Sequence, residues 1–344
     1  MDMLILVDYR SQFYSSTRSR GASLDVSRLR IGFEQLGYTV SVKQFAGINL
    51  QTDNYKDAFV LYQSSEDNGL VYKDYIEDIL FGLSLHGSIL IPDLPYFRAH
   101  HNKVFMEVLR DVVGDKVSQK LSSQSFGTYE EYKQFFIPKD FPVVLKPGAG
   151  SKSRNVSFAN NREEADRHAR RLSATPSFFN FKLLCKNLFD RRGFSPISNN
   201  RRKFMIQPFI PNLLGDYKIV VYGDKYFVLF RENRPDDFRA SGSGRLSFPN
   251  DVPREVLSCA RQIFENFKAP FISMDIGYDG QQCYLFEFQF VLFGQYAVEK
   301  SPGYFHWNKD RWNFVEKRSI VEEEFVLSTH SYIQKKKLGG HNGP

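Results

Sequence analysis

Three side chains with oxygen atoms suited to metal binding lie on either side of a short predicted turn. Asp275 comes before the turn, and Glu287 and Gln289 come after it. The turn holds Asp279-Gly280, a pair typical of β-hairpins because both residue types accept the backbone angles of a tight turn. Carboxylate and amide oxygens are hard ligands that Mg²⁺ and Mn²⁺ prefer. The pattern predicts either a metal-binding face or the ordinary solvent-facing side of a hairpin.

The apolar residues of the same stretch predict which face these ligands occupy. Side chains alternate between the two faces of a strand, so apolar residues at every second position form a core face. We expect the two apolar sets to pair only if the loop holds an odd number of residues. Asp275 and Glu287 would then be diagonal neighbours on the other face, close enough to share a cation. The expected core residues are Ile272, Met274, Ile276, Tyr284, Phe286 and Phe288.

A second candidate for chemistry is a run of glycine, serine and basic residues. The predicted strand 142–147 contains Lys146, and the run 148–154 follows it. It is not a Walker A loop, because no glycine directly precedes Lys152 and a strand follows where a P-loop needs a helix. A turn of this composition between two strands can fold over phosphates with its N–H groups inward. We therefore predict a phosphate-covering flap.

Strands and helices alternate through the first hundred residues. This spacing predicts a small parallel sheet with crossover helices, whose ligands bind at the carboxyl ends of the strands. Arg10, Arg18 and Arg20 follow the first strand, and Glu66 follows the third. The three arginines predict either a clamp for a substrate carboxylate or phosphate, or a solvated basic loop, and Glu66 is placed to face the same substrate. The expected strands are 4–7, 39–45, 58–62 and 88–91, and the expected helices are 26–36 and 72–83.

Short helices and antiparallel strands are expected in the rest of the chain. Thr128 and Glu131 have the spacing of a capping box. The basic stretch 172–203 predicts a mobile insertion, with a docking surface as the alternative. The further expected elements are a helix at 102–112, a strand at 204–210, a hairpin at 216–231, a glycine-rich loop at 236–244 and a helix beginning at Pro253.

The composition is that of a globular protein. Of the 344 residues, 42% are hydrophobic and 25% charged, and no apolar run approaches the roughly 18 residues that a membrane span needs. Three widely spaced cysteines form no disulfide framework or paired-cysteine zinc site. With no signal-peptide pattern, they favour a cytoplasmic location. The net charge of +7, without a nucleic-acid motif, favours a small anionic substrate over nucleic acid.

The order of these elements resembles the ATP-grasp superfamily, and most of all its carboxylate–amine ligases of the ribosomal-protein glutamate ligase and D-alanine–D-alanine ligase type. The resemblance covers residues 100–295. It rests on an early lysine, a Lys-Pro strand with a flap, an Ile-Gln-x-Phe-Ile strand, an Asp-x-Lys hairpin ending in Arg, an Asp-Phe-Arg loop and the paired Asp and Glu strands.

The resemblance implies an α/β fold that is α+β in its ATP-grasp part. A small parallel α/β N-terminal lobe would precede two antiparallel α+β subdomains that grasp ATP. The implied divisions are a substrate-binding lobe at 1–98, a helical connection at 99–137, a lid subdomain at 138–210 with the basic insertion, a catalytic subdomain at 211–330 and a flexible tail at 331–344.

The resemblance also implies the cofactors ATP and Mg²⁺ (or Mn²⁺), with residues for each. Arg231 would face the γ-phosphate and the acyl intermediate, and Arg239 would orient the carboxylate substrate. The further substrate candidates come from the loops of the first lobe and are Arg10, Arg18, Arg20 and Glu66. Asp275, Glu287 and Gln289 would bind metal. The implied nucleotide-binding residues are Lys103, Lys146, Gly150, Ser151, Ser153, Gln207, Phe209, Ile210, Asp216 and Lys218, of which Lys146 would also be catalytic.

Two positions and one stretch depart from the family pattern. Gln289 stands where relatives usually have Asn, and Pro208 stands in the hinge where many have Glu. The stretch 290–294, Phe-Val-Leu-Phe-Gly, replaces the usual small-residue Pro-Gly turn. These departures concern the second metal, a contact to adenine and the segment that follows the metal ligands.

The implied function is ATP-dependent ligation of a carboxylate and an amine, an amino acid or a peptide, through an acyl phosphate. The first alternative is an ATP-grasp kinase that phosphorylates a hydroxyl. The second is a non-catalytic protein that binds nucleotide or nucleic acid. The sequence does not identify the carboxylate and amine substrates. It predicts no membrane partner and is compatible with a homodimer.

Overall fold

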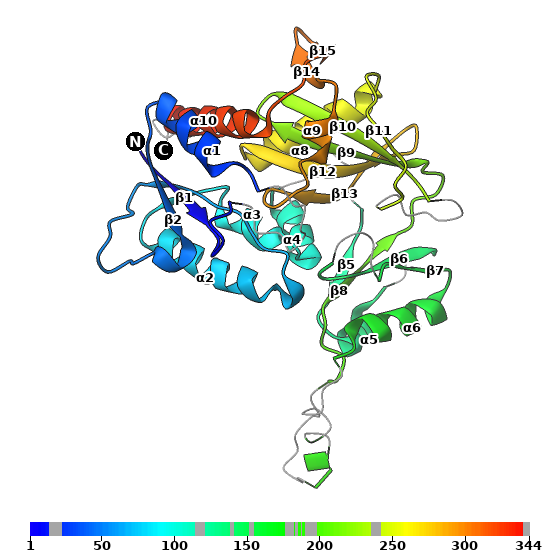
Figure 1. Cartoon of the computed structure of the whole chain (residues 1–344). Helices are drawn as coiled ribbons and strands as arrows, with labels where there is room; N and C mark the ends of the chain where they lie inside the picture. The colour runs from blue at the N-terminus through cyan, green and yellow to red at the C-terminus, as the bar shows by residue number, and fades with distance from the viewer. Residues whose placement is uncertain are drawn as a thin grey trace. The chain divides into compact units, whose positions relative to one another are not determined.

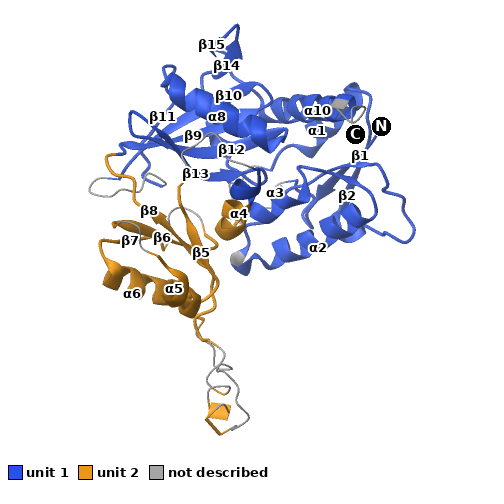
Figure 2. Ribbon diagram, turned by 180° about the vertical axis from the view of Figure 1, so that it is seen from behind, with its two compact units in different colours: residues 1–100, 109–119, 213–344 blue, residues 101–108, 120–212 orange. Residues whose placement is uncertain are grey.

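The computed structural model describes residues 1–13, 23–113, 121–137, 141–150, 155–175, 182, 185–186, 188–189, 198–234 and 242–339. Figure 1 shows the chain, which divides into two compact units (Figure 2). Unit 1 holds residues 1–100, 109–119 and 213–344, and unit 2 holds residues 101–108 and 120–212. Helix α4 (Lys103–Val113) has residues in both units.

A four-stranded parallel sheet forms the first part of unit 1. Its strand order is β2-β1-β3-β4, and every neighbouring pair is parallel, as the alternation of strands and helices predicts. Asp25 caps α1 by accepting hydrogen bonds from the backbone N–H groups of Ser27 and Arg28. The elements are β1 (Asp2–Val7), α1 (Val26–Gln35), β2 (Thr39–Gln44), η1 (Phe45–Gly47), β3 (Phe59–Leu61), η2 (Asn68–Leu70), α2 (Val71–Leu85), β4 (Ile89–Ile91) and α3 (Leu94–Ala99).

An antiparallel sheet forms the second part of unit 1. Its order is β13-β12-β9-β10-β14-β15, with β11 paired to β10. The 216–231 hairpin is confirmed, because β9 and β10 pair from Tyr222 and Lys225 outward across a two-residue turn. Its strands are β9 (Gly215–Tyr222), β10 (Lys225–Glu232), β11 (Leu246–Ser247), β12 (Phe271–Tyr278), β13 (Cys283–Gln289), β14 (Tyr304–Asn308) and β15 (Arg311–Val315), and its helices are α8 (Arg254–Phe267), α9 (Tyr296–Lys300) and α10 (Val321–Gly339).

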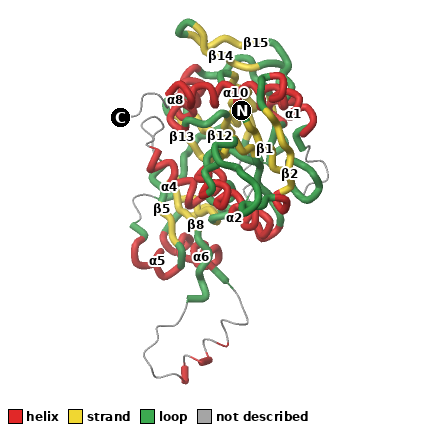
Figure 3. Tube along the Cα trace, turned by 90° about the vertical axis from the view of Figure 1, so that its left-hand side faces the viewer, coloured by secondary structure: helices red, strands yellow, loops and turns green. Residues whose placement is uncertain are grey.

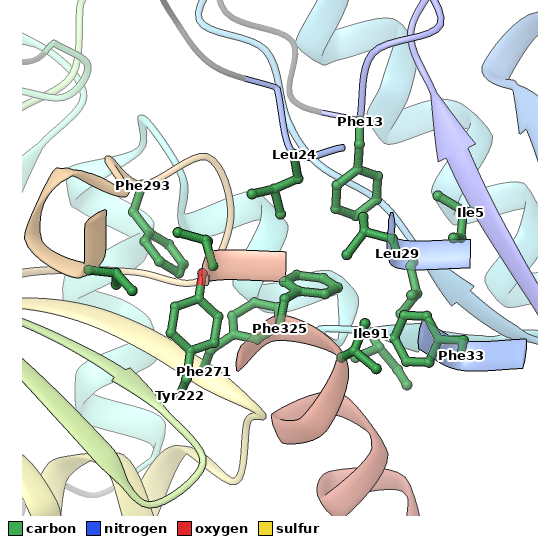
Figure 4. Packing of buried hydrophobic residues seen from close by; sticks show 14 of the residues in the cluster. Ile5, Phe13, Leu24, Leu29, Phe33, Ile91, Tyr222, Phe271, Phe293 and Phe325 are labelled. Atoms are coloured by element: carbon green, nitrogen blue, oxygen red, sulfur yellow. The ribbon is translucent and has the colours of Figure 1, made fainter. Parts of the chain in front are cut away.

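The two sheets of unit 1 share one hydrophobic core. Phe33 of α1, Phe271 of β12 and Phe325 of α10 belong to the same buried cluster (Figure 4). The ring of Phe325 lies 4.8 Å from that of Phe271 and 5.5 Å from that of Phe13. Residues 331–339, expected in the flexible tail, instead continue α10, and Ile333 is fully buried there. Helix α10 thus joins the two sheets into one body.

Unit 2 is a four-stranded antiparallel sheet with α5 and α6 packed on one face (Figure 3). Thr128 and Glu131 form the predicted capping box at the start of α5. Tyr132 stacks on Phe136 at 4.9 Å in the core. The elements are β5 (Gln124–Phe126), α5 (Tyr129–Phe135), β6 (Val143–Pro147), β7 (Ser157–Ala159), α6 (Arg162–Ser173) and β8 (Phe204–Pro208).

The observed elements confirm the predicted fold class, a parallel α/β lobe followed by antiparallel α+β parts. Most of the predicted insertion lies outside the described residues. Among the helices that the structure describes, none combines the length and the apolar character that crossing a membrane requires.

Candidate functional site

One face of the antiparallel sheet in unit 1 gathers charged residues from four adjoining strands. Asp275 on β12 is opposite Lys218 on β9 and opposite Glu287 on β13. Asp216 on β9 is opposite Arg231 on β10. Because directly opposed residues project to the same side of a sheet, these five side chains share one face. The alternation of residue types in each strand is what places them there.

Arg231 is the centre of this charged face. Its Nε and Nη2 donate to Oδ1 and Oδ2 of Asp216 at 2.6 and 2.8 Å, a two-pronged contact. Nη2 also lies 2.7 Å from Oδ2 of Asp275. The side chains of Arg231 and Asp216 are only 11% and 12% exposed. One guanidinium therefore links two nearly buried carboxylates.

Lys218 is held at the same face by a neighbouring strand. Its Nζ donates to Oγ of Ser273 at 2.8 Å and lies 3.6 Å from Oδ1 of Asp275. Ser273 is 2% exposed and follows the same alternation along β12 as Asp275. Ser273 was not among the site residues predicted from the sequence, and its place two residues before Asp275 in β12 was the available signal.

Burial and charge act against each other in this network. Burial disfavours the charge of Arg231, but the nearby carboxylates of Asp275 and Asp216 raise its pKa above the ordinary arginine value. Burial raises the pKa of the Asp216 carboxyl, and the guanidinium of Arg231 acts in the opposite direction. Arg231 is therefore a permanent cation whose position is fixed by two anions.

The predicted geometry of the hairpin is wrong in its loop and in part of the β13 core face, and right in placing Asp275, Glu287 and Gln289 on one face. β12 and β13 are joined by four residues, 279–282, since Tyr278 pairs with Cys283. A β-bulge between Asp275 and Ile276 shifts the register, so Asp275 directly opposes Glu287 rather than lying diagonal to it. The one-residue shift of the bulge places Asp275 and Glu287 on the same face, which an odd loop was expected to do.

The bulge also changes the core face of β13. Leu285, opposite Ile276, is buried together with Phe288, whereas the expected core residues Tyr284 and Phe286 are only half-buried. A Cβ atom on Gly277 would lie 2.5 Å from the Phe286 ring. Glycine at 277 thus makes room for the ring on the charged face of the sheet.

The donor set of this face fits a hard divalent cation. Asp275 and Glu287 are direct partners in the ladder, and such partners in regular strands have Cβ atoms about 4.5–5.5 Å apart. Each carboxylate has about four lone-pair sites, so a metal could share the Asp275 carboxylate with the cations Arg231 and Lys218. Gln289 donates from Nε2 to Oε1 of Glu287 at 3.3 Å, and a half-turn of its amide would present the oxygen instead.

In unit 2 the fold brings Lys103 beside the start of the predicted flap. The backbone N–H of Lys103 donates to the carbonyl of Gly148 at 2.8 Å. Gly148 in turn donates to the carbonyl of Lys203 at 2.9 Å, and a Cβ atom at 148 would lie 2.6 Å from the Lys203 side chain. Only glycine fits this close approach. Lys146 lies two residues earlier on β6 and is half-buried.

The hinge residues predicted to bind nucleotide are buried or half-buried. Gln207 is 3% exposed, and its Nε2 donates to Oε1 of Glu107 on α4 at 3.5 Å. The backbone N–H of Phe209 donates to the carbonyl of Pro142 at 3.1 Å. Ile210 and the Phe209 ring are half-buried.

At the carboxyl edge of the parallel sheet, Arg10 is fixed by Asp8. Nε and Nη2 of Arg10 donate to Oδ2 of Asp8 at 2.9 and 2.8 Å, and Asp8 is 1% exposed. Asp8 also accepts the backbone N–H groups of Arg10 and Gln12. The position of Asp8 after an apolar strand was the available signal for this role. Glu66 lies half-buried at the same edge, after β3.

Five predicted site residues fall outside the described part of the chain. They are Arg18, Arg20, Ser151, Ser153 and Arg239. Gly150, the last described residue of the flap, has a φ of 140°, a backbone angle that residues with a side chain rarely adopt.

The comparisons with known proteins agree with the observed architecture. No protein-family model and no curated protein matches the sequence. Many solved structures match this chain, and DcsG, PsnB and MdnC are three that cover nearly its full length. The D-cycloserine synthetase DcsG matches with a TM-score of 0.55 at 13% identity, covering 96% of this chain and 99% of its own. The ATP-grasp ligase PsnB, solved with a minimal precursor, matches with a TM-score of 0.52 at 13% identity, covering 96% and 98%.

The chain has the ATP-grasp fold. The macrocyclase MdnC from Microcystis aeruginosa MRC, bound with its precursor peptide MdnA, matches with a TM-score of 0.50 at 12% identity, covering 95% of this chain and 98% of its own. The ATP-grasp fold predicted from the order of sequence motifs is thereby confirmed.

Proposed function

We propose that this ATP-grasp chain is an ATP- and Mg²⁺-dependent carboxylate–amine ligase that forms an amide or peptide bond through an acyl phosphate. The observation that supports this most strongly is the charged face of unit 1. There Arg231 is fixed between Asp216 and Asp275, and Asp275 directly opposes Glu287.

The reaction needs positive charge where negative charge develops. The carboxylate oxygen attacks the γ-phosphorus of ATP, the bond to ADP breaks, and an acyl phosphate forms. The amine then attacks the acyl carbon, the bond to phosphate breaks, and the amine loses a proton. Both steps pass through anionic states, so fixed cations favour them and no protein nucleophile is required.

Arg231 is suited to stabilise the transferring phosphoryl group. Its three contacts to carboxylates use Nε and Nη2. Among the described residues, Nη1 makes no hydrogen bond, so its two N–H groups remain as donors for a phosphate or acyl oxygen. Lys218, held by Ser273, supplies a second cation on the same face.

Lys103 and Lys146 are proposed to hold the ATP phosphates in unit 2, with the flap 148–153 covering them. The hinge 207–210 is proposed to border adenine, with Ile210 as its backbone contact, since the N–H of Phe209 already has a partner. Asp275, Glu287 and Gln289 would hold Mg²⁺ or Mn²⁺. A bound divalent cation would offset the negative charge of the phosphates.

The substrates are proposed to be an amino acid or a peptide. The PsnB and MdnC structures contain a precursor or precursor peptide, and DcsG is a synthetase of D-cycloserine. Arg10, fixed by the buried Asp8, is suited to bind a substrate carboxylate at the edge of the parallel sheet. Arg18, Arg20, Glu66 and Arg239 are the further proposed substrate residues.

The test is a panel of amino acids and peptides scored for ADP release with Mg²⁺, with products identified by mass. We expect ADP and a ligated product with one carboxylate–amine pair, and loss of both in Lys146→Ala and Glu287→Ala variants that remain folded. Full turnover in both variants would refute the site assignment.

A further inference from the structure

The segment directly after the proposed metal ligands is anchored to the other sheet of unit 1. The backbone N–H of Leu292 donates to Oε1 of Gln63 at 2.7 Å, a buried bond between residues 229 positions apart. Gln63 follows β3 in the parallel sheet, and Leu292 comes three residues after Gln289. One hydrogen bond therefore ties the end of β13 to the edge of the parallel sheet.

The backbone at Leu292 is held in a conformation that a leucine rarely adopts. Its φ is 51°, in the left-handed region. Residues with a Cβ atom persist there when the surroundings enforce the conformation, and such positions cluster at functional sites. The hydrogen bond that Leu292 donates to Gln63 is one of the constraints on this turn.

The side chains of the same turn enter both halves of the unit 1 core. Val291 is fully buried in the cluster of the parallel sheet, with Tyr62. Phe293 is buried in the cluster shared with the antiparallel sheet, 6.0 Å from the ring of Phe271. The large side chains of this turn depart from the pattern of the ATP-grasp ligases that the sequence resembles. They are buried in the core and therefore hold the segment against both sheets.

We propose that Gln63 is a positioning residue for the divalent cation, acting through Leu292 on Gln289 and Glu287. This inference rests on the proposed function, because that function supplies the metal. Gln63 also directly precedes Ser64, Ser65 and Glu66 at the proposed substrate edge. The bond therefore connects the substrate edge of the parallel sheet with the strand that carries two metal ligands.

The test measures Mn²⁺ affinity of the full chain with ADP, by the electron paramagnetic resonance signal of free Mn²⁺. Gln63→Met keeps the side-chain length and removes the acceptor, and we expect it to raise the Mn²⁺ dissociation constant by about 10-fold, as supporting residues of metal ligands often do. Gln63→Glu keeps an acceptor oxygen and should bind Mn²⁺ close to the wild-type value. Adding Leu292→Gly to Gln63→Met should restore part of the affinity, because glycine adopts a positive φ without support.

A second readout and a control separate positioning from general loosening. Amide hydrogen exchange at Leu292 should accelerate in Gln63→Met and stay slow in Gln63→Glu. Gln295→Met removes the acceptor of the Tyr222 hydroxyl, 2.9 Å away in the same turn region, and should leave Mn²⁺ affinity unchanged.

Three outcomes would overturn the inference. Unchanged Mn²⁺ affinity in Gln63→Met would overturn the inference and leave the proposed function standing. A loss of Mn²⁺ affinity in Gln295→Met as large as that in Gln63→Met would do the same. A wild-type protein that binds no Mn²⁺ with ADP would refute the proposed metal site and the inference with it.

Discussion

Nη2 of Arg231 lies 2.7 Å from Oδ2 of Asp275, so one guanidinium on β10 reaches across β9 to β12. The same guanidinium binds Asp216 on the strand between them. Three strands therefore share one charge network, and its parts should depend on one another in both stability and catalysis.

The first prediction concerns the stability of this network. Arg231→Met removes the cation between two nearly buried carboxylates and should destabilise the protein by about 3–5 kcal/mol, the usual effect of breaking a buried ion pair. Adding Asp216→Asn should recover part of this loss, because it removes one stranded charge. Urea unfolding of the two single variants and the double variant measures both effects. Strict additivity would show that the residues are not coupled.

The second prediction concerns the close approach of β9 and β10 beside Arg231. A Cβ atom at Gly215 would lie 2.1 Å from the backbone oxygen of Arg231, which cannot move without shifting β10. Gly215→Ala should therefore destabilise by at least about 2 kcal/mol and lower ADP release. Gly47→Ala is the matched control, because nothing lies within 4 Å of its Cβ position. Equal thermal melting of the two variants would contradict this reasoning.

Local patterns predicted the charged face because its members follow strand alternation. Asp275, Glu287 and Gln289 share a face because side chains alternate between the two faces of a strand. This alternation can be read from each strand alone. The loop length was predicted wrongly, because a bulge between Asp275 and Ile276 can replace an odd loop and leaves no clear signal in residue types. Strand register depends on packing across the sheet as well as on the turn.

Contacts between distant parts of the chain were beyond sequence reasoning. Gln63 and Leu292 are 229 residues apart, and neither residue type indicates that the two form a hydrogen bond. Helix α10 was not predicted, and residues 331–339 were assigned to a flexible tail, because the helix packs against both α1 and the antiparallel sheet. Its apolar residues therefore do not form the single stripe by which amphipathic helices are recognised.

The third prediction concerns the metal ligands. Glu287→Gln should weaken Mn²⁺ binding in the presence of ADP by at least about 10-fold, since an amide is a weaker ligand than a carboxylate and carries no charge. Glu265→Gln on α8 removes an equally sized carboxylate that pairs with Arg261 and should leave the affinity unchanged. Titration calorimetry provides the comparison. Equal affinity in the wild type and Glu287→Gln would exclude Glu287 as a ligand.

The fourth prediction concerns acid stability at the parallel sheet. Hydrogen bonds from Lys43, then from Tyr55 and Thr52, lower the pKa of Asp53 to about 2. An unfolded aspartate titrates near pH ~3.9, so the stability due to Asp53 is present above that pH and is lost as pH falls towards 2. Lys43→Met should raise the Asp53 pKa towards the ordinary value and flatten this loss. Carbon NMR of the Asp53 carboxyl tests it, and an unchanged titration in Lys43→Met would contradict the assigned cause.

The most direct measurement of the central claim follows the oxygen atoms of the carboxylate. A substrate identified from the panel is labelled with ¹⁸O in the reacting carboxyl group and turned over with ATP and Mg²⁺. An acyl phosphate carries one carboxylate oxygen to phosphorus, so the inorganic phosphate released should contain one ¹⁸O atom per ligated product. Unlabelled phosphate alongside ligated product, or a phosphorylated product with no release of inorganic phosphate, would contradict ligation through an acyl phosphate.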